Sequence, residues 1–310
     1  MSHYLVTGGA GFIGSHLCEE LLRRGHQVRV ADDLSTGKRG NLQKGVEFVE
    51  GDLADLATAR RVVEGCHYVL HQAAIPSVPR SVKDPLTSHR ANVDATVNML
   101  IAARDAGVKR LVFAGSSSAY GDTPTLPKRE DMPNGPLSPY ALQKVIGEQY
   151  LQMFTKLYGL ETVTIRYFNV FGPRQDPASE YAAVIPRFIT AALAGKGVTV
   201  FGDGTQSRDF CFIDNTVEAN LAAASAPASA VSGGVFNVAC GAATSLNDVV
   251  KLVADIVGHT VPIAYAQGRV GDVKHSLADI TAARERLGYR GAISFAEGLK
   301  RTAAWYAEKH

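Results

Sequence analysis

The stretch Thr7-Gly8-Gly9-Ala10-Gly11-Phe12-Ile13-Gly14 joins a short β-rich run to an amphipathic helical pattern near the start of the chain. Its glycines at positions 8, 11 and 14 allow a tight turn, a close approach of the backbone to an anion, and close packing of a helix on a sheet. The free amides at the start of that helix then face the anion. The stretch predicts a turn that binds the pyrophosphate of a dinucleotide, and the alternative is a glycine-rich turn without a ligand.

Asp32 ends the second predicted strand, 18 residues after Gly14. A carboxylate about 20 residues beyond such a turn holds the hydroxyls of an adenosine ribose, and it repels a 2′-phosphate. The position therefore predicts a dinucleotide site and favours NAD. Lys38 and Arg39 follow closely, and two interpretations of them stay open. They either offset the repulsion of a phosphate or are solvated loop charges.

Short β-rich runs alternate with helical patterns through the first half of the chain. Such alternation predicts βαβ units and a doubly wound parallel sheet of the Rossmann type. The predicted strands cover residues 4–6, 27–31, 46–49, 68–71, 110–114 and 163–168, and the predicted helices cover residues 12–24, 55–64, 86–105 and 139–158.

The alternation loosens after Asn169, where Gly172-Pro173 interrupts it. We therefore expect an α/β chain with two domains: a dinucleotide-binding domain over residues 1–170, to which some later segments return, and a smaller substrate domain over residues 171–310. In the second domain, helices are predicted at residues 183–194, 246–257 and 295–308, and strands at residues 198–201 and 210–213.

The composition excludes several classes of protein. Of the 310 residues, 46% are hydrophobic and 20% are charged, which is enough apolar material for a buried core. The net charge of +2, from 32 Lys+Arg against 30 Asp+Glu, offers no basic field for a nucleic acid. The longest uncharged run, residues 219–247, is broken by proline and glycine, so we expect a loop between a helix and a strand there and no membrane span.

Cellular location and metal binding are predicted from patterns that the sequence lacks. No basic segment followed by an apolar one precedes the first strand, so no signal peptide is expected. The four cysteines form no CxxC pair, and the nine histidines form no HExxH or HxH spacing. We expect thiols in the reducing cytoplasm, no metal site, and a packed or hydrogen-bonded role for His71.

Tyr140 and Lys144 lie four residues apart near the start of a predicted helix, so they share one face. A free phenol, with a pKa near ~10, is too weak a base at neutral pH, but a nearby ammonium and an oxidised nicotinamide lower that pKa. The pair therefore predicts a tyrosine that removes a hydroxyl proton while hydride leaves the same carbon. A surface pair on a helix is the alternative.

Ser116-Ser117-Ser118 directly follow the strand predicted at residues 110–114. Ligands of an open parallel sheet bind beyond the carboxyl ends of its strands, so these hydroxyls are expected in the same site as Tyr140. A serine-rich turn that bonds its own backbone is the alternative.

Four motifs occur in order along the chain: TGGAGFIG, SSSAYG, SPYALQK and RYFNVFGPR. With them the chain resembles the extended short-chain dehydrogenase/reductase superfamily and, within it, the UDP-sugar C4-epimerases. The resemblance runs nearly from end to end. It implies NAD as a cofactor that stays bound and a UDP-sugar as substrate. It also implies that Tyr140 is the base and acid, that Lys144 lowers the pKa of Tyr140 and holds the nicotinamide ribose, and that Ser116 bonds the reacting oxygen.

The same resemblance implies the residues that bind the two ligands. For NAD they are Gly8, Gly11, Phe12, Ile13, Gly14, Asp32, Ser35, Thr36, Gly37, Asp52, Leu53, Gln72, Ala73, Ala74, Asn92, Tyr140, Lys144, Tyr167 and Phe168. For the UDP-sugar they are Ser77, Ser116, Ser117, Ser118, Tyr140, Asn169, Ala183, Val184, Thr199, Phe201, Arg208, Arg269, Asp272 and Ser276.

The resemblance covers enzymes with several reactions. Its dehydratases usually carry an Asp-Glu pair where this chain has Ser117 and Ser118, so the proton carriers for eliminating water are missing here. Epimerisation at C4 needs only the serine, tyrosine and lysine set. Three alternatives stay open: another nucleotide-sugar dehydratase, a 4-ketoreductase, and a non-catalytic dinucleotide-binding protein.

Ser276 occupies a position that is a tyrosine in family members limited to plain hexoses. A small side chain leaves room for an N-acetyl group at C2 of the sugar. The resemblance therefore implies interconversion of UDP-N-acetylglucosamine and UDP-N-acetylgalactosamine, with UDP-glucose and UDP-galactose tolerated or poor. A serine without a role in specificity is the alternative.

The helices predicted at residues 86–105 and 139–158 match the helices that superfamily members pair into a four-helix bundle. The resemblance therefore implies a homodimer.

Overall fold

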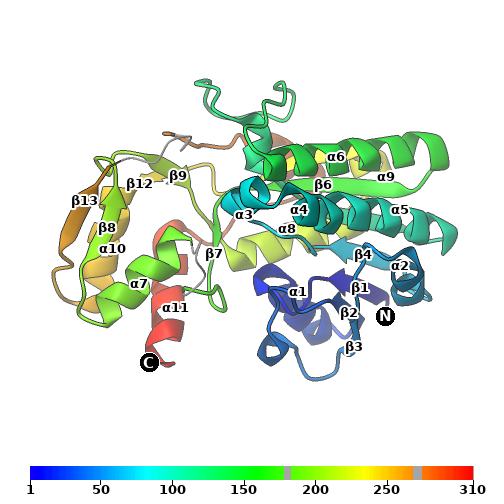
Figure 1. Cartoon of the computed structure of the whole chain (residues 1–310), viewed down its shortest axis with the longest axis horizontal. Coiled ribbons are helices and arrows are strands. Elements are labelled where there is room, and N and C mark those ends of the chain that lie inside the picture. Colours follow the sequence, from blue (N-terminus) through cyan, green and yellow to red (C-terminus); the bar gives the residue numbers. More distant parts are fainter. Residues whose placement is uncertain (178–182, 268–273, 310) are drawn as a thin grey trace.

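A parallel sheet is the largest element of the fold (Figure 1). The computed structural model describes residues 1–177, 183–267 and 274–309. Within these residues seven strands pair in the order β11-β6-β5-β4-β1-β2-β3, and every pair is parallel. The strands are β1 (His3–Thr7), β2 (Gln27–Asp32), β3 (Glu47–Glu50), β4 (Tyr68–His71), β5 (Arg110–Ser116), β6 (Glu161–Tyr167) and β11 (Gly234–Val238).

The strand order explains where a ligand can bind. The chain builds the sheet outward from β1 in one direction, through β2 and β3, and then in the other, through β4, β5 and β6. Between β1 and β4 the two connections diverge, and the crevice at the carboxyl ends of these strands is the usual ligand site of such sheets. The predicted doubly wound α/β fold of the Rossmann type is confirmed.

Helices cover both faces of the sheet. Helices α1 (Phe12–Arg23) and α8 (Ile213–Ser225) pack against each other on one face. Helices α2 (Leu56–Val63), α5 (Ala95–Asp105) and α6 (Pro139–Tyr158) pack on the other, where Figure 1 shows α5 and α6 side by side. Because successive side chains of a strand point to opposite faces, the sheet divides the core into two clusters.

Helix α6 begins where its sequence specifies a start. The side chain of Ser138 accepts a hydrogen bond from the amide of Ala141 at 3.2 Å, and Pro139 occupies the first turn, where a missing N–H costs nothing. Gly159, with a φ of 71°, ends the helix. This cap fixes Tyr140 and Lys144 in the first turns of the helix, at the carboxyl edge of the sheet.

The helix predicted over residues 86–105 is interrupted, which corrects the prediction. It consists of α4 (Pro85–His89), a π-helical turn (Arg90–Asp94) and α5. The π turn lies where the Asn92 side chain leaves the helix surface and accepts a hydrogen bond from the amide of Ile75 at 2.8 Å. A helical period in the sequence does not register such a local insertion.

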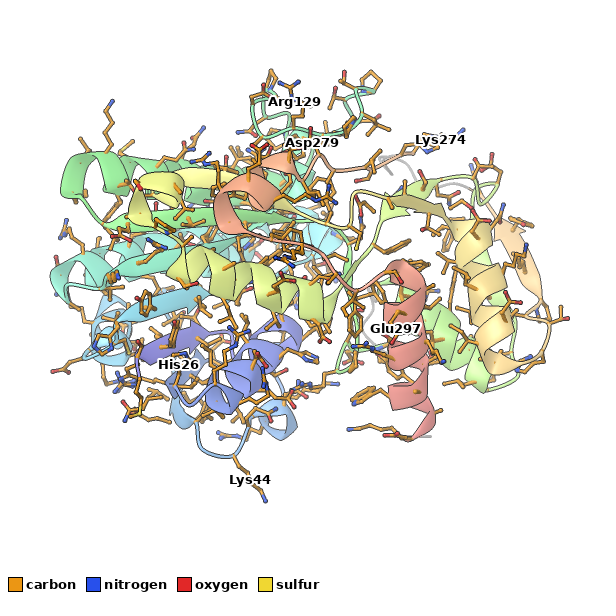
Figure 2. All side chains as sticks on the ribbon, turned by 180° about the vertical axis from the view of Figure 1, so that it is seen from behind. His26, Lys44, Arg129, Lys274, Asp279 and Glu297 are labelled. Atoms are coloured by element: carbon orange, nitrogen blue, oxygen red, sulfur yellow. The ribbon has the colours of Figure 1, made fainter. Side chains whose placement is uncertain are left out.

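The smaller part of the molecule lies beyond β7 (Val170–Phe171) and contains two-stranded pairings (Figure 1). It consists of β8 (Val198–Phe201) with β13 (Ile263–Ala266), β9 (Ser207–Asp209) with β12 (Ala243–Ser245), and β10 (Cys211–Phe212) with β7, together with α7 (Val184–Leu193), α10 (Leu246–Val257) and α11 (Phe295–Ala307). Figure 2, seen from behind, marks with Lys274 and Asp279 the ends of a segment that leads from this part back toward the sheet. Short elements complete the described chain: α3 (Val78–Lys83), α9 (Ala228–Val231), and helical turns at Arg39–Asn41, Ser117–Tyr120 and Ala283–Leu287.

The loop predicted over residues 219–247 is wrong. That run holds the end of α8, the short α9, strand β11 at the edge of the sheet, and β12. Alanine is the best helix former, and Ala219, Ala223 and Ala224 are buried in α8, so small residues here pack closely and do not signal a loop. Helix α8 and strand β11 lie with the large sheet, although they follow residue 170. The division at residues 170 and 171 stays a prediction.

No helix among the described residues combines the length and the apolar character that crossing a bilayer requires.

Candidate active site

Two adjoining cavities lie at the carboxyl edge of the sheet. The larger, here called the main cavity, measures about 750 Å³ and is lined both by the glycine-rich turn and by Ser116, Tyr140 and Lys144. The structure thus brings together residues more than a hundred positions apart in the sequence. The predicted ligand residues on its wall are Gly8, Gly11, Phe12, Ile13, Gly14, Asp32, Ser35, Thr36, Asp52, Leu53, Gln72, Ala73, Ala74, Ser77, Ser116, Ser117, Tyr140, Lys144, Tyr167, Asn169 and Ala183.

The glycine-rich turn is built so closely that side chains are excluded at two positions. Gly8 has a φ of +68°, and a Cβ there would lie 2.8 Å from the amide nitrogen of Ala73. A Cβ on Gly14 would lie 2.2 Å from the carbonyl oxygen of Gly8. Gly11 forms the N-cap of α1 without a side-chain cap, so amides of the first turn stay directed at the cavity. This cradle fits a pyrophosphate.

Asp32 is almost fully buried at the end of β2. Its carboxylate accepts hydrogen bonds from the amides of Ala10 at 3.0 Å and Leu34 at 2.9 Å. Burial raises the pKa of this carboxyl above its ordinary value, and the two amides oppose the rise. Gly37 supports the same group, because a Cβ on it would lie 2.8 Å from Asp32 Oδ1.

The two cations after Asp32 both have carboxylate partners. Lys38 Nζ lies 2.7 Å from Asp176 Oδ2, and Arg39 pairs with Glu50. These pairs agree with the interpretation of Lys38 and Arg39 as loop charges, and they favour ribose hydroxyls over a 2′-phosphate beside Asp32.

His71 lies behind the cavity wall and makes hydrogen bonds through both ring nitrogens. Nδ1 shares one with Thr7 Oγ1 at 2.8 Å, and Nε2 shares one with Thr96 Oγ1 at 3.1 Å. Burial, with a smaller effect of Lys144, lowers the pKa of His71 to about 3. The predicted packed and hydrogen-bonded role is confirmed.

Tyr140 and Ser116 both line the main cavity and lie next to each other. Burial raises the pKa of Tyr140 above its ordinary value, and a side-chain hydrogen bond with Ser116 opposes the rise. Ser116 Oγ also accepts hydrogen bonds from Ser118, from Oγ at 2.8 Å and from the amide at 3.2 Å. Ser118 therefore orients Ser116. Ser118 itself does not line the main cavity.

Lys144 is buried with its ammonium held in place. Nζ donates a hydrogen bond to the carbonyl oxygen of Ala114 at 2.8 Å and lies 4.8 Å from the ring centre of Phe113. The ring centre of Tyr140 is 6.0 Å from the same nitrogen. Burial lowers the pKa of Lys144 to about 7, so the amine exchanges its proton near neutral pH.

Two polar networks hold the wall of the main cavity. Asn92 Nδ2 donates to Gln143 Oε1 at 2.8 Å, which ties the π turn to the residue before Lys144. Tyr167 donates to Gln72 Oε1 at 3.0 Å and accepts from Asn220 Nδ2 at 2.8 Å. Asn220 belongs to α8. It was not predicted as a site residue, because part of this helix was interpreted as a loop.

Three predicted NAD residues support the wall and do not line it. Gly37 packs on Asp32, Asn92 bonds the backbone of Ile75, and Phe168 is fully buried in the core.

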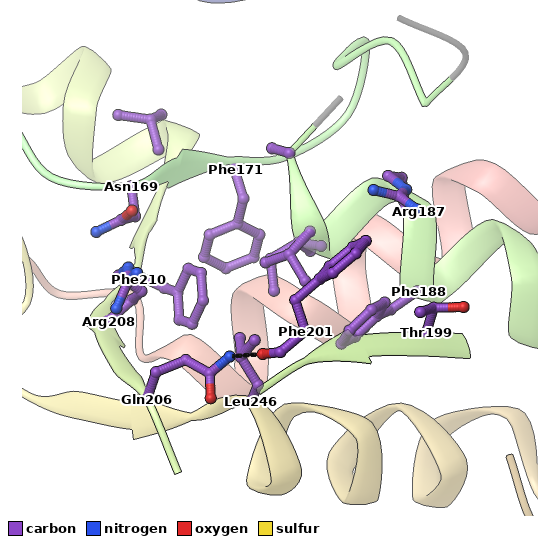
Figure 3. Close-up of a pocket in the computed structure, with 14 residues that line it drawn as sticks. Asn169, Phe171, Arg187, Phe188, Thr199, Phe201, Gln206, Arg208, Phe210 and Leu246 are labelled. Carbon is purple, nitrogen blue, oxygen red and sulfur yellow. Dashed lines mark hydrogen bonds between the residues drawn. The ribbon is translucent and has the colours of Figure 1, made fainter. Parts of the chain in front are cut away.

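The smaller cavity, here called the side cavity, measures about 240 Å³ and opens beside β9 (Figure 3). Asn169, Val170 and Ala183 line both cavities, so the two cavities adjoin. Asn169 has a φ of +36°, a left-handed conformation that asparagine tolerates better than most residues. In Figure 3, Arg208 and Asn169 lie at one end, beside the rings of Phe210 and Phe171.

The predicted substrate residues separate into several groups. Ser77, Ser116, Ser117 and Tyr140 line the main cavity, and Ser118 lines neither cavity. Asn169, Ala183, Val184, Thr199, Phe201 and Arg208 line the side cavity. Ser276 is half-buried next to β9 and lines neither cavity among the described residues, and its amide donates to Ser207 O at 3.1 Å. Arg269 and Asp272 lie outside the described residues.

Several lining residues of the side cavity were missed from sequence. Arg187 belongs to α7, whereas Gln206 and Phe210 lie on either side of β9, and the sequence pattern alone does not bring these segments together. For Phe210 a signal existed, since it is two residues from Arg208 and alternate residues of an extended chain share a face.

Comparison with known proteins shows which family has this site. The family model described as the NAD dependent epimerase/dehydratase family matches residues 4–239. The chain belongs to this family. The resemblance seen in the four motifs is thereby confirmed, and NAD is the cofactor of the family. The glycine cradle and Asp32 fit that cofactor.

Similar proteins include a UDP-glucose 4-epimerase from Mycolicibacterium smegmatis, 42% identical over 312 residues, which cover 98% of each chain. Among solved structures, the UDP-glucose 4-epimerase of Thermotoga maritima with UDP-glucose has a TM-score of 0.95 at 38% identity, and 99% of each chain is covered. The UDP-N-acetylglucosamine 4-epimerase of Methanobrevibacter ruminantium M1, in complex with UDP-N-acetylmuramic acid, has a TM-score of 0.93 at 39% identity. That match covers 100% of this chain and 99% of the other.

Proposed function

We propose that this family member is an NAD-dependent UDP-sugar 4-epimerase that favours UDP-N-acetylglucosamine and UDP-N-acetylgalactosamine. One observation carries the proposal. The main cavity holds the dinucleotide cradle and the Ser116, Tyr140 and Lys144 set together, and it adjoins a side cavity that has Arg208 on its wall. A dinucleotide and a nucleotide sugar would therefore meet at Tyr140.

In this mechanism Tyr140 removes the proton of the sugar 4-hydroxyl and later returns it. The glycine-rich turn and Asp32 would hold NAD, which would supply a hydride acceptor and donor for C4 of the sugar. Ser116 shares a hydrogen bond with Tyr140 and is oriented by Ser118, so it is placed to donate to the reacting oxygen. The sugar must turn between the two transfers.

The proposed role of Lys144 follows from its burial. Its ammonium near the phenol ring favours the phenolate, because an opposite charge stabilises an ionised group in a low dielectric. Its own pKa of about 7 allows it to carry the charge at or below neutral pH. The hydrogen bond to Ala114 O fixes the distance to the ring.

The proposed preference for N-acetylated sugars rests on Ser276. Separately, Arg269 and Asp272 are proposed to bind the nucleotide diphosphate and its ribose. A serine leaves space that a tyrosine would fill. The two solved relatives described above are named for different substrates, UDP-glucose and UDP-N-acetylglucosamine, so both substrate pairs belong in the test.

Elimination of water, the dehydratase alternative, is less well supported. It needs a carboxyl group next to the reacting sugar, and the turn after β5 offers Ser117 and Ser118 instead. The carboxylates that line the main cavity among the described residues are Asp32, Asp33, Asp52 and Asp176. They come from other segments than the serine turn.

We also propose a cytoplasmic location and a homodimer that forms through the helices of residues 86–105 and 139–158, which include α4, α5 and α6. Helix α6 packs on α4, and together they expose Leu86, Leu142, Met153 and Leu157. A row of exposed apolar side chains is typical of a surface that another chain covers. The four cysteines are free thiols, as a reducing compartment favours.

The decisive experiment incubates the purified protein with each UDP-sugar and no added cofactor, and follows the products by NMR. We expect C4 epimers from both N-acetylated sugars, and none from Tyr140→Phe. Net consumption of added NADH would point to a reductase, and loss of water from the sugar would point to a dehydratase. Unchanged substrate with an NAD-loaded protein would contradict the proposal.

A further inference from the structure

Asp209, the last residue of β9, has a carboxylate that binds backbone from two other segments. It is fully buried. Oδ1 accepts the amide of Cys240 at 2.9 Å, and Oδ2 accepts the amides of Gly241 at 3.0 Å and Ala278 at 3.2 Å. The first two amides follow β11, and the third belongs to the segment of residues 274–279.

The segment of residues 274–279 is held on its other side as well. Its Leu277 carbonyl accepts from the amide of Lys128 at 2.7 Å, and its Asp279 amide donates to Lys128 O at 2.9 Å. Asn237 Nδ2 donates to Asp279 O at 3.2 Å. Figure 2 shows Asp279 near Arg129, which follows Lys128. The segment is therefore clamped between the loop at Lys128 and β9.

Strand β9 connects this clamp to the side cavity. Gln206, Arg208 and Phe210 line the cavity, whereas Asp209 lies between them with a fully buried side chain that is not part of the lining. Arg208 Nη1 donates to Lys274 O at 3.1 Å, and the amide of Ser276 donates to Ser207 O at 3.1 Å. Because these hydrogen bonds join β9 to the segment, a shift of β9 would move Arg208 and Ser276 together.

We propose that Asp209 is a positioning residue for the nucleotide sugar, acting through Arg208 and through the segment that carries Ser276; this inference rests on the proposed epimerase function. A carboxylate suits the task because both oxygens only accept hydrogen bonds. An asparagine would place an N–H donor against backbone N–H donors, so at least one buried amide would lose its partner. Burial raises the pKa of Asp209 to about 6, and the backbone amides oppose the rise.

The test compares Asp209→Asn with Asp203→Asn in the NAD-loaded protein. Asp203 is a matched control, because its carboxylate also accepts a backbone amide, that of Thr205 at 2.9 Å, but on the exposed loop before β9. For Asp209→Asn we expect the Kd for UDP and the KM for the UDP-sugar to rise at least about tenfold, because the free variant would hold Arg208 and Ser276 in the binding geometry for a smaller fraction of the time. We expect kcat to stay within about threefold. The control variant keeps all three values.

The outcomes separate the inference from the function on which it rests. If the unchanged protein binds UDP and epimerises while Asp209→Asn retains its UDP affinity and KM, the positioning role is wrong and the function stands. A fall in kcat at constant KM also overturns the positioning role. If the unchanged protein neither binds UDP nor epimerises, the proposed function is the part that fails.

A second measurement does not depend on the folding of the variant. Hydrogen exchange of the unchanged protein, with and without UDP, reports on the peptide that covers residues 274–279. We expect UDP to slow its exchange at least about fivefold, because the ligand holds Arg208 and so tightens the clamp. Helix α2 serves as the reference and should not change. Equal exchange of residues 274–279 in both states overturns the proposal.

Discussion

Replacing Lys144 by methionine should stabilise the NAD-free fold while abolishing turnover. The lysine is buried, and its pKa is lowered to about 7 from the ordinary 10.5. A lowered pKa makes the fold less stable at every pH at which the unfolded chain holds the proton, because the folded chain must either release that proton or bury the charge. This penalty is absent well above pH 10.5, grows as the pH falls toward 7, and is constant below that.

The magnitude follows from these two pKa values. The linkage relation gives a penalty of about 4 kcal/mol at pH 7 and about 2 kcal/mol at pH 9. Methionine removes it, but the Ala114 carbonyl loses its hydrogen bond, which costs about 1 kcal/mol. Lys144→Met is therefore expected to unfold with a free energy about 3 kcal/mol higher than the unchanged protein at pH 7, and about 1 kcal/mol higher at pH 9.

Urea unfolding of protein freed of NAD, at pH 7 and pH 9, measures both differences. Lys156→Met is the control, because Lys156 is an exposed lysine on the same helix and its replacement should give the same small change at both pH values. The reasoning that burial of Lys144 destabilises the fold would be refuted by a Lys144→Met variant that is less stable at pH 7. It would also be refuted if the increase in the free energy of unfolding did not depend on pH.

Three further changes probe other parts of the molecule. Gly14→Ala should weaken NAD binding at least about tenfold and destabilise the fold by about 1–3 kcal/mol, since its Cβ would lie 2.2 Å from Gly8 O; fluorescence titration and thermal unfolding measure the two effects. Ser276→Tyr should lower kcat/KM for UDP-N-acetylglucosamine at least about tenfold and leave that for UDP-glucose within about threefold, whereas equal changes for both sugars would remove Ser276 from specificity. Leu157→Glu should yield monomers by light scattering where the unchanged protein gives dimers, because a charge would be buried in the interface; a single-chain mass for both would reject the dimer.

Much of the fold was predictable because strong local signals agree with one another. The glycine-rich turn, the apolar runs of the parallel strands and the Ser138-Pro139 cap each specify one structure, and β4 and α6 have the predicted bounds. The seventh strand, β11, was missed because its neighbours are alanine, serine and glycine, which local pattern assigns to a loop. Its place in the sheet is decided by pairing with β6, far away in the chain.

The candidate site also contains some residues that were predictable from the sequence and others that were not. Residues carried by contiguous motifs, such as Tyr140 and Lys144, were predictable, whereas Asp209, Asn220 and Asn237 were not. These three act through hydrogen bonds to segments distant in sequence, and only folding creates their partners. The π turn at Asn92 belongs to the same class, because a buried amide and not the helical period determines it.

The junction at Asn169, Val170 and Ala183 has a consequence for how the molecule can be redesigned. The two cavities share only Asn169, Val170 and Ala183 among the described residues. The residues of α7 and β8 that line the side cavity are therefore different from Ser116, Tyr140 and Lys144 on the main cavity. Substitutions in the side cavity could therefore change which nucleotide the protein binds and leave the catalytic residues of the main cavity unchanged.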